Sequence, residues 1–178
     1  MLTKIIKPIL STIDAVSIST GKLFSFLIVG LFGIMTVEVV RRYVFNAPIM
    51  GVQDVTAAYF GAYYTMAAAY TLWAKGHVSV DVLYVLAPLR GRAILDLITF
   101  PFFLLFAGAL VYTGWQFGML ATWVEGVGWN LEVDQSHLRL PLYPPKWTIA
   151  IGSFLLLLQG CAKFVRDLKF AVTGKELE

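Results

Sequence analysis

The sequence predicts an all-α integral membrane protein with four transmembrane helices in a single domain over residues 1–178. Of the 178 residues, 58% are hydrophobic and only 14% are charged, whereas soluble domains have roughly 45–50% and about 25%. The mean hydropathy is +0.75. The apolar residues are gathered in long continuous stretches, which favours helices over the alternating strands of a membrane β-barrel.

The apolar stretches predict transmembrane helices at about residues 20–41, 52–74, 92–121 and 146–166. A hydrocarbon core about 30 Å thick needs roughly 20 helical residues. The first stretch is interpreted as a retained helix, because it starts late for a cleaved signal and ends in charged residues and not in a small-residue site.

Two shorter segments are expected in the membrane interface. The residues before the first span combine apolar side chains at helical spacing with Lys4, Lys7 and Asp14, which predicts an amphipathic N-terminal lead-in. The segment 76–86, between the second and third helices, is apolar but too short to span. We expect it to lie in the interface plane, with Pro88 starting the third helix.

The distribution of lysine and arginine predicts that both termini are cytoplasmic. With this orientation, four of these residues lie outside: Arg41, Arg42, Arg139 and Lys146. Ten lie inside: Lys4, Lys7, Lys22, Lys75, Arg90, Arg92, Lys163, Arg166, Lys169 and Lys175. Cytoplasmic loops carry the excess of such residues, so the N-in, C-in topology is favoured.

Ionisable residues near the membrane are expected at helix ends. Glu38, Asp54, Asp96 and Lys163 each lie within about a turn of a predicted terminus. Glu38 precedes Arg41 and Arg42 by three and four residues, the spacing at which helical side chains pair. A chain that conducts ions alone would be expected to place a charge or a broken helix near mid-membrane. The absence of a mid-membrane charge therefore argues against such a pathway.

The sequence predicts no enzyme activity, cofactor or metal site. His77 and His137 fall on opposite sides of the membrane in the predicted topology and cannot share a metal, and no histidine pair is placed to hold a haem between helices. The net charge of +3 is spread along the chain. This distribution lacks the basic patch typical of nucleic-acid binding.

Small residues recur at a spacing that favours close helix packing. They are Ala57, Gly61, Thr65 and Ala69 in the second helix, and Gly114 and Gly118 in the third. Such residues let helix backbones approach closely in lipid. Packing inside the four-helix unit is the favoured interpretation, and packing against another chain is the alternative.

Three motifs together resemble a known transporter family. The first runs Glu38-Val-Val-Arg-Arg-Tyr-Val-Phe-Asn-Ala-Pro48, the second Gly76-His-Val-Ser-Val-Asp81-Val, and the third is Leu158-Gln159-Gly160. Their order and spacing resemble the small membrane subunit (DctQ-type) of tripartite ATP-independent periplasmic (TRAP) transporters over nearly the whole chain. One departure is at the second helix, where family members often have tryptophan before the acid that is Asp54 here.

The resemblance implies a role in ion-coupled solute uptake across the bacterial inner membrane. In this family a large permease subunit (DctM-type) carries the substrate and sodium sites and works by an elevator movement. A periplasmic binding protein delivers the solute, commonly an organic acid. The small subunit joins the large one and extends its fixed scaffold.

Two groups of polar residues are candidates for this role. A cluster at the periplasmic end is expected to contact the large subunit or to brace the first two helices: Glu38, Arg41, Arg42, Tyr43, Asn46 and Asp54. Gly76, His77 and Asp81 are expected to order the cytoplasmic loop. The alternatives are a stand-alone oligomeric transporter or channel, and the membrane-anchor subunit of a redox complex.

Overall fold

The computed structural model describes residues 2–76, 88–124, 128–129, 131–133, 139 and 141–174. The helices in these ranges are α1 (Leu2–Tyr43), α2 (Val52–Trp73), α4 (Leu89–Thr122) and α5 (Tyr143–Thr173). Two short strands, β1 (Trp123–Val124) and β2 (Gly128–Trp129), pair antiparallel after α4. The fold is all-α, as predicted.

Three of the described helices have the length and composition to cross a membrane. These helices are α1, α4 and α5, and the candidate spans are Ile6–Tyr43, Arg90–Thr122 and Tyr143–Thr173. Helix α2 has the necessary length, at 22 residues, but many of these are alanine, threonine and tyrosine, which are less apolar than leucine or isoleucine.

Helix α1 joins the predicted lead-in and the first span in one element of 42 residues. Pro8 lies near its beginning, where the missing N–H removes only one early hydrogen bond, and the helix continues through it. At 1.5 Å per residue the helix is about 63 Å long, roughly twice the hydrocarbon thickness. A large part of α1 must therefore extend beyond the lipid core or lie strongly tilted in it.

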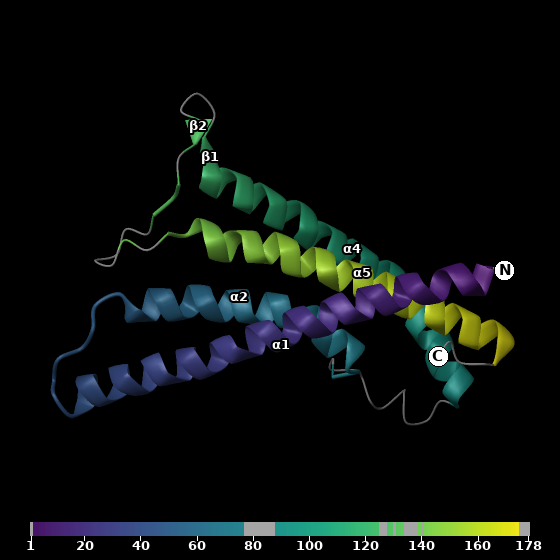
Figure 1. The fold of residues 1–178 in the computed structure, drawn as a ribbon, viewed down its shortest axis with the longest axis horizontal. Helices are drawn as coiled ribbons and strands as arrows, with labels where there is room; N and C mark the ends of the chain where they lie inside the picture. The colour runs from purple at the N-terminus through teal and green to yellow at the C-terminus, as the bar shows by residue number, and fades with distance from the viewer. Residues whose placement is uncertain are drawn as a thin grey trace.

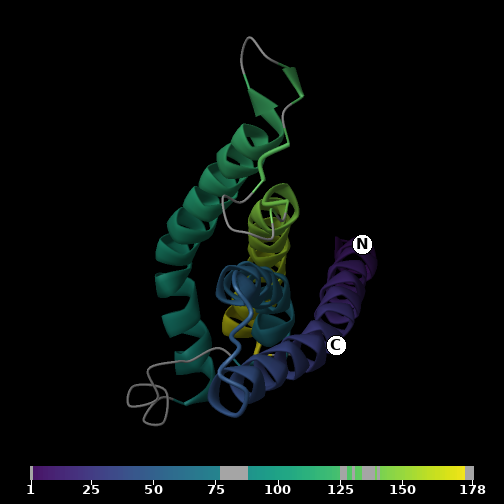
Figure 2. The same ribbon diagram turned by 90° about the vertical axis from the view of Figure 1, so that its left-hand side faces the viewer.

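The helices form two hairpins that meet through their inner members. Helix α1 packs on α2, α2 on α5, and α5 on α4, while direct contact between α1 and α5 is limited. Seen end-on, α2 and α5 lie in the middle, with α4 on one side and α1 on the other (Figure 2). Of the most apolar stretch of each helix, 39% is buried in α5 but only 6% in α4 and 11% in α1. Helix α5 is thus the centre of the bundle, and α1 and α4 are its flanks.

A buried stripe with heptad-like spacing runs along α1. Leu10, Ser17, Gly21, Leu31 and Glu38 are all buried, at intervals of seven, four, ten and seven residues. Steps of three, four and seven keep one face of a helix turned toward a neighbour that crosses at a small angle. Because these residues are buried, the stripe faces the helices that α1 contacts, which are chiefly α2 and to a smaller extent α5.

Glycines mark the closest contacts between helices. A methyl group at Gly152 of α5 would lie 2.5 Å from the carbonyl oxygen of Thr65 in α2. One at Gly21 of α1 would overlap Tyr70 of α2, and one at Gly160 of α5 would overlap the Phe103 ring of α4. The α1–α2, α2–α5 and α4–α5 contacts therefore each include a position without a side chain.

The predicted packing residues divide between the inside and the outside of the bundle. Gly114 and Gly118 are buried in the α4–α5 contact, where added methyl groups would lie 2.9 Å from the Ala150 nitrogen and 2.8 Å from the Trp147 ring. On α2, Ala69 is fully buried and Thr65 half-buried. Ala57 and Gly61 are exposed, and a methyl group at Gly61 would meet no atom within 4 Å.

The connection between α4 and α5 is tied to both helices. The Glu132 N–H donates to the Ala121 carbonyl at 2.9 Å, and the Glu132 side chain pairs with Lys146 near the start of α5. Trp123 and Trp129 meet edge to face, with ring centroids 5.7 Å apart, and Trp129 is 79% exposed. Exposed tryptophans of this kind are typical of a membrane–water interface.

Candidate functional site

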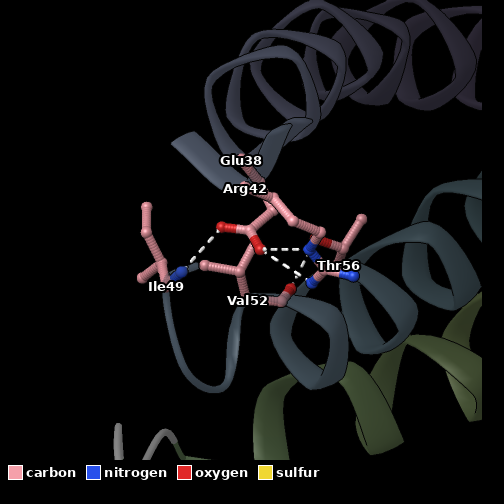
Figure 3. Close-up of polar contacts among 5 residues, drawn as sticks. All are labelled: Glu38, Arg42, Ile49, Val52 and Thr56. Atoms are coloured by element: carbon pink, nitrogen blue, oxygen red, sulfur yellow. Dashed lines mark hydrogen bonds and ion pairs between the residues drawn. The ribbon is translucent and has the colours of Figure 1, made fainter. Parts of the chain in front are cut away.

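Glu38 is a buried carboxylate at the junction of α1 and α2. Its exposed fraction is 3%. The Arg42 side chain donates to its Oε1 through Nη2 at 2.8 Å and Nε at 3.2 Å. Its Oε2 accepts the backbone N–H of Ile49 at 2.9 Å (Figure 3). We call Glu38, Arg42 and Ile49 the Glu38 cluster.

The local sequence explains how this cluster forms. Glu38 belongs to the buried stripe of α1, and Arg42 follows one helical turn later. The chain then reverses through residues 44–51, with Asn46 at φ 51° and Gly51 at φ 85°. Glycine adopts this left-handed region freely, and asparagine does so more often than most residues. The turn at Asn46 brings Ile49 back toward the end of α1, so that its N–H meets the carboxylate, and the turn at Gly51 leads the chain into α2.

Helix α2 begins directly beside the cluster. Val52 and Thr56, both buried in its first turns, face Glu38, and the Thr56 hydroxyl donates to the Val52 carbonyl at 2.6 Å (Figure 3). Hydrogen bonds to charged groups contribute about 1.5–3 kcal/mol each when buried. The Arg42 side chain is 39% exposed, so its share is smaller. The carboxylate fixes the turn and thereby the angle at which α2 leaves α1.

The other residues of the predicted periplasmic group lie outside the cluster. Arg41, Tyr43, Asn46 and Asp54 are exposed, Tyr43 at 76%. Arg41 contributes its carbonyl, which accepts the Ala47 N–H at 3.0 Å. Within the described ranges, no hydrogen bond or ion pair joins the Asp54 side chain to the arginines. The structure thus brings Glu38 and Arg42 together and leaves these four residues on the surface.

A second polar site, which the sequence reasoning missed, joins α1 to α5. The Ser17 hydroxyl donates to Gln159 Oε1 at 3.0 Å, and Gln159 Nε2 donates to Asp14 Oδ1 at 2.9 Å. Arg166 Nη2 donates to Asp14 Oδ2 at 2.5 Å. Ser17 and Gln159 are each 1% exposed. We call these four residues the Gln159 network.

The spacing of the Gln159 network contains a signal that could have found it. Asp14 and Ser17 are three residues apart on α1, and Gln159 and Arg166 are seven apart on α5, so each pair shares one helix face. Polar side chains that hydrogen-bond across helices contribute about 0.6 kcal/mol on average in membranes, and at most about 1.7. The network fixes the register of α1 on α5 and leaves the Gln159 side chain bonded at both ends.

Asp96 and Lys163, which the sequence places near helix ends, form an ion pair between α4 and α5. Their Nζ–Oδ2 distance is 2.8 Å, and Asp167 approaches the same lysine at 3.9 Å. The side chains are partly exposed, at 40% for Lys163 and 18% for Asp96. The helices extend further than predicted, so Asp96 lies seven residues after the start of α4 and Lys163 ten residues before the end of α5. The pair therefore joins the two helices about two to three turns inside these ends and not within one turn of them.

The predicted loop residues are only partly described. Gly76 donates its N–H to the Thr71 carbonyl at 2.8 Å and closes the end of α2. His77 and Asp81, and likewise His137, lie outside the described residues. Among the described residues, no group of three or more histidine, cysteine, aspartate or glutamate side chains is arranged to hold a metal ion.

Comparison with known proteins gives one family. The sequence model of the family described as "Tripartite ATP-independent periplasmic transporters, DctQ component" matches residues 31–170, well over half of the chain. The matched region contains the Glu38 cluster, Gln159 and Arg166, but begins after Asp14 and Ser17. A search of curated proteins finds no match.

Proposed function

Since this chain belongs to the DctQ family of tripartite ATP-independent periplasmic transporters, and is a small membrane subunit of such a transporter, we propose that it forms a fixed scaffold for the large, DctM-type permease subunit. The complex would take up an organic acid, and this uptake would be coupled to the movement of an ion. A periplasmic solute-binding protein would deliver the solute.

One observation carries the scaffold role: the flanking helices bury very little of their apolar surface within the chain. The buried share is 6% for α4 and 11% for α1. Large apolar side chains line both flanks, among them Phe26 at 76%, Phe32 at 73%, Phe102 at 73% and Leu105 at 73% exposed. Such broad apolar faces suit a protein that is covered by lipid on one side and by a partner helix bundle on another.

We propose an inner-membrane location with four crossings and both termini in the cytoplasm. Helix α2 follows α1 after a short turn, packs against α1 and α5, and is long enough at 22 residues to span the core. Its lower hydropathy is compatible with this place, because α2 lies in the middle of the bundle and meets less lipid (Figure 2). Lysine and arginine are more numerous at the end of the bundle that contains both termini than at the end with the α1–α2 turn, and this excess supports the orientation.

The exposed residues beside the Glu38 cluster are proposed to meet the large subunit. This surface offers a positive charge, an aromatic ring, an amide and a negative charge at one end of the molecule, from Arg41, Tyr43, Asn46 and Asp54. Ala57 and Gly61 continue from Asp54 along α2 as an exposed, small-residue surface. Small residues permit close approach of a partner helix. Glu38 and Arg42 would then act indirectly by holding this surface in place.

Co-purification with the large subunit tests the proposed contact surface. We expect the double variant Arg41→Ala/Asp54→Ala to recover about one tenth or less of the large subunit that the unmodified chain recovers, a loss of about 1.4 kcal/mol or more in binding. The free chain should keep its stability, since exposed side chains of this kind contribute little to folding. Solute uptake by cells should fall with the recovered complex.

Lys22→Ala is the control, because it removes an exposed cation from the same helix at a distance from this surface. It should leave recovery and uptake unchanged. Full recovery of the large subunit by the double variant, with normal uptake, would place the contact elsewhere and contradict this assignment.

A further inference from the structure

A charged cavity of about 570 Å³ lies between the ends of α1, α2 and α5. The residues that matter for its chemistry are Lys7, Ser11, Asp14, Trp73, Lys75 and Arg166. Its volume is in the range of about 300–1,000 Å³ that is usual for small-ligand sites. Its lining residues on α1, Lys7 to Asp14, belong to the first turns of this helix, far along the helix from Glu38; Figure 1 shows the N-terminal and C-terminal ends of α1 at opposite sides of the molecule.

The cavity carries a net positive charge. Arg166 and Asp14 neutralise one another through their 2.5 Å contact. Lys7 and Lys75 are exposed and form no ion pair among the described residues, so the lining residues carry a charge of +2. Asp167, outside the lining, is attracted to Lys75 and offsets part of this charge. Arg166 uses Nη2 toward Asp14, and the guanidinium has further N–H donors. Ser11 adds a hydroxyl donor on the α1 side.

The position of the cavity identifies the kind of anion that fits. Trp73 ends α2 and is 39% exposed at the cavity, and tryptophan side chains gather at the level of lipid headgroups. The buried Leu10 gives the cavity an apolar floor on the α1 side. Basic pockets between transmembrane helices are the sites that bind anionic phospholipid headgroups.

We propose that this cavity binds the phosphate headgroup of an anionic phospholipid. Lys7 and Lys75 provide the charge, Ser11 and Arg166 donate hydrogen bonds, and Trp73 sets the depth of the glycerol backbone. A bound headgroup joins the first turns of α1 to the last turns of α2 and α5. The proposal rests on the membrane location of the helices and is independent of the contact with the large subunit.

Native mass spectrometry of the purified full-length chain tests the site, with phosphatidylglycerol and phosphatidylcholine of identical acyl chains as probes. We expect preferential retention of phosphatidylglycerol. A surface lysine contributes about fivefold to anionic lipid affinity, so Lys7→Gln/Lys75→Gln should lose about 25-fold. The control, Lys22→Gln/Lys169→Gln, removes the same charge from residues outside the cavity and should retain the lipid. Lys7→Arg/Lys75→Arg keeps the charge and should retain it as well.

Three outcomes would overturn the proposal. Equal retention of the two lipids would show that charge is not recognised. Equal losses in the cavity and control variants would show diffuse surface attraction and no site. Displacement of phosphatidylglycerol by millimolar inorganic phosphate would identify a site for the free anion and not for a lipid. Each readout is separate from recovery of the large subunit, so failure here leaves the proposed function standing.

Discussion

Gly152→Leu is expected to separate α2 from α5 and to destabilise the isolated chain by about 3 kcal/mol or more. The first carbon of any side chain at this position would lie 2.5 Å from the Thr65 oxygen, 2.6 Å from the Thr65 carbonyl carbon and 3.1 Å from the Met66 nitrogen. These are backbone atoms of α2, which cannot rotate away as a side chain does. Overpacking usually costs about 1–3 kcal/mol, and here the helices themselves must move.

A thermal unfolding series in detergent measures this effect. A change of 3 kcal/mol corresponds to a decrease of roughly 6–12 °C in the unfolding midpoint for a chain of this size. Gly61→Leu on α2 is the matched control, since a side chain there enters open space, and it should leave the midpoint within about 2 °C. Equal midpoints for the two variants would show that α2 and α5 are not in the described contact.

Glu38→Ala is expected to release the α1–α2 turn and to cost about 2–3 kcal/mol. The substitution removes the acceptor of the Ile49 N–H and the partner of Arg42. A buried donor left without a partner costs about 1–3 kcal/mol, and the Ile49 N–H is partly buried. The Arg42 side chain can reach water because it is 39% exposed. Glu38→Gln keeps one oxygen acceptor and should lose about half as much.

Hydrogen exchange at the Ile49 amide gives a local readout of the same prediction. The amide should exchange at least tenfold faster in Glu38→Ala than in the unmodified chain, because its acceptor is gone. Asp54→Ala, which removes an exposed carboxylate from the first turn of α2, should leave this rate unchanged. A protected Ile49 amide in Glu38→Ala would mean that another group holds the turn.

The fold class follows from composition because lipid selects for continuous apolar helices. Helix α2 runs from residue 52 to 73, and α4 from 89 to 122, close to the predicted stretches 52–74 and 92–121. The main difference is α1, which extends to Leu2. Hydropathy locates the part of a helix that matches lipid, but it does not show where the same helix ends in water. Hydropathy therefore separates the charged N-terminal lead-in from the first span, although both belong to one continuous helix.

The candidate sites were predictable only where they depend on local spacing. The Glu38–Arg42 pair is four residues apart on one helix, so the sequence contains it directly. The Ile49 N–H enters through the geometry of the turn, which spacing along a helix does not describe. The Gln159 network unites residues 14 and 159, and the sequence alone does not tell which helices are neighbours.

Reconstitution into proteoliposomes tests the scaffold role most directly. Vesicles would contain the large permease subunit with this chain, the large subunit alone, or this chain alone, each with the periplasmic binding protein, a sodium gradient and a panel of organic acids. We expect uptake only where both membrane subunits are present, and none from this chain alone. Uptake by this chain alone, or undiminished uptake by the large subunit alone, would contradict the scaffold function.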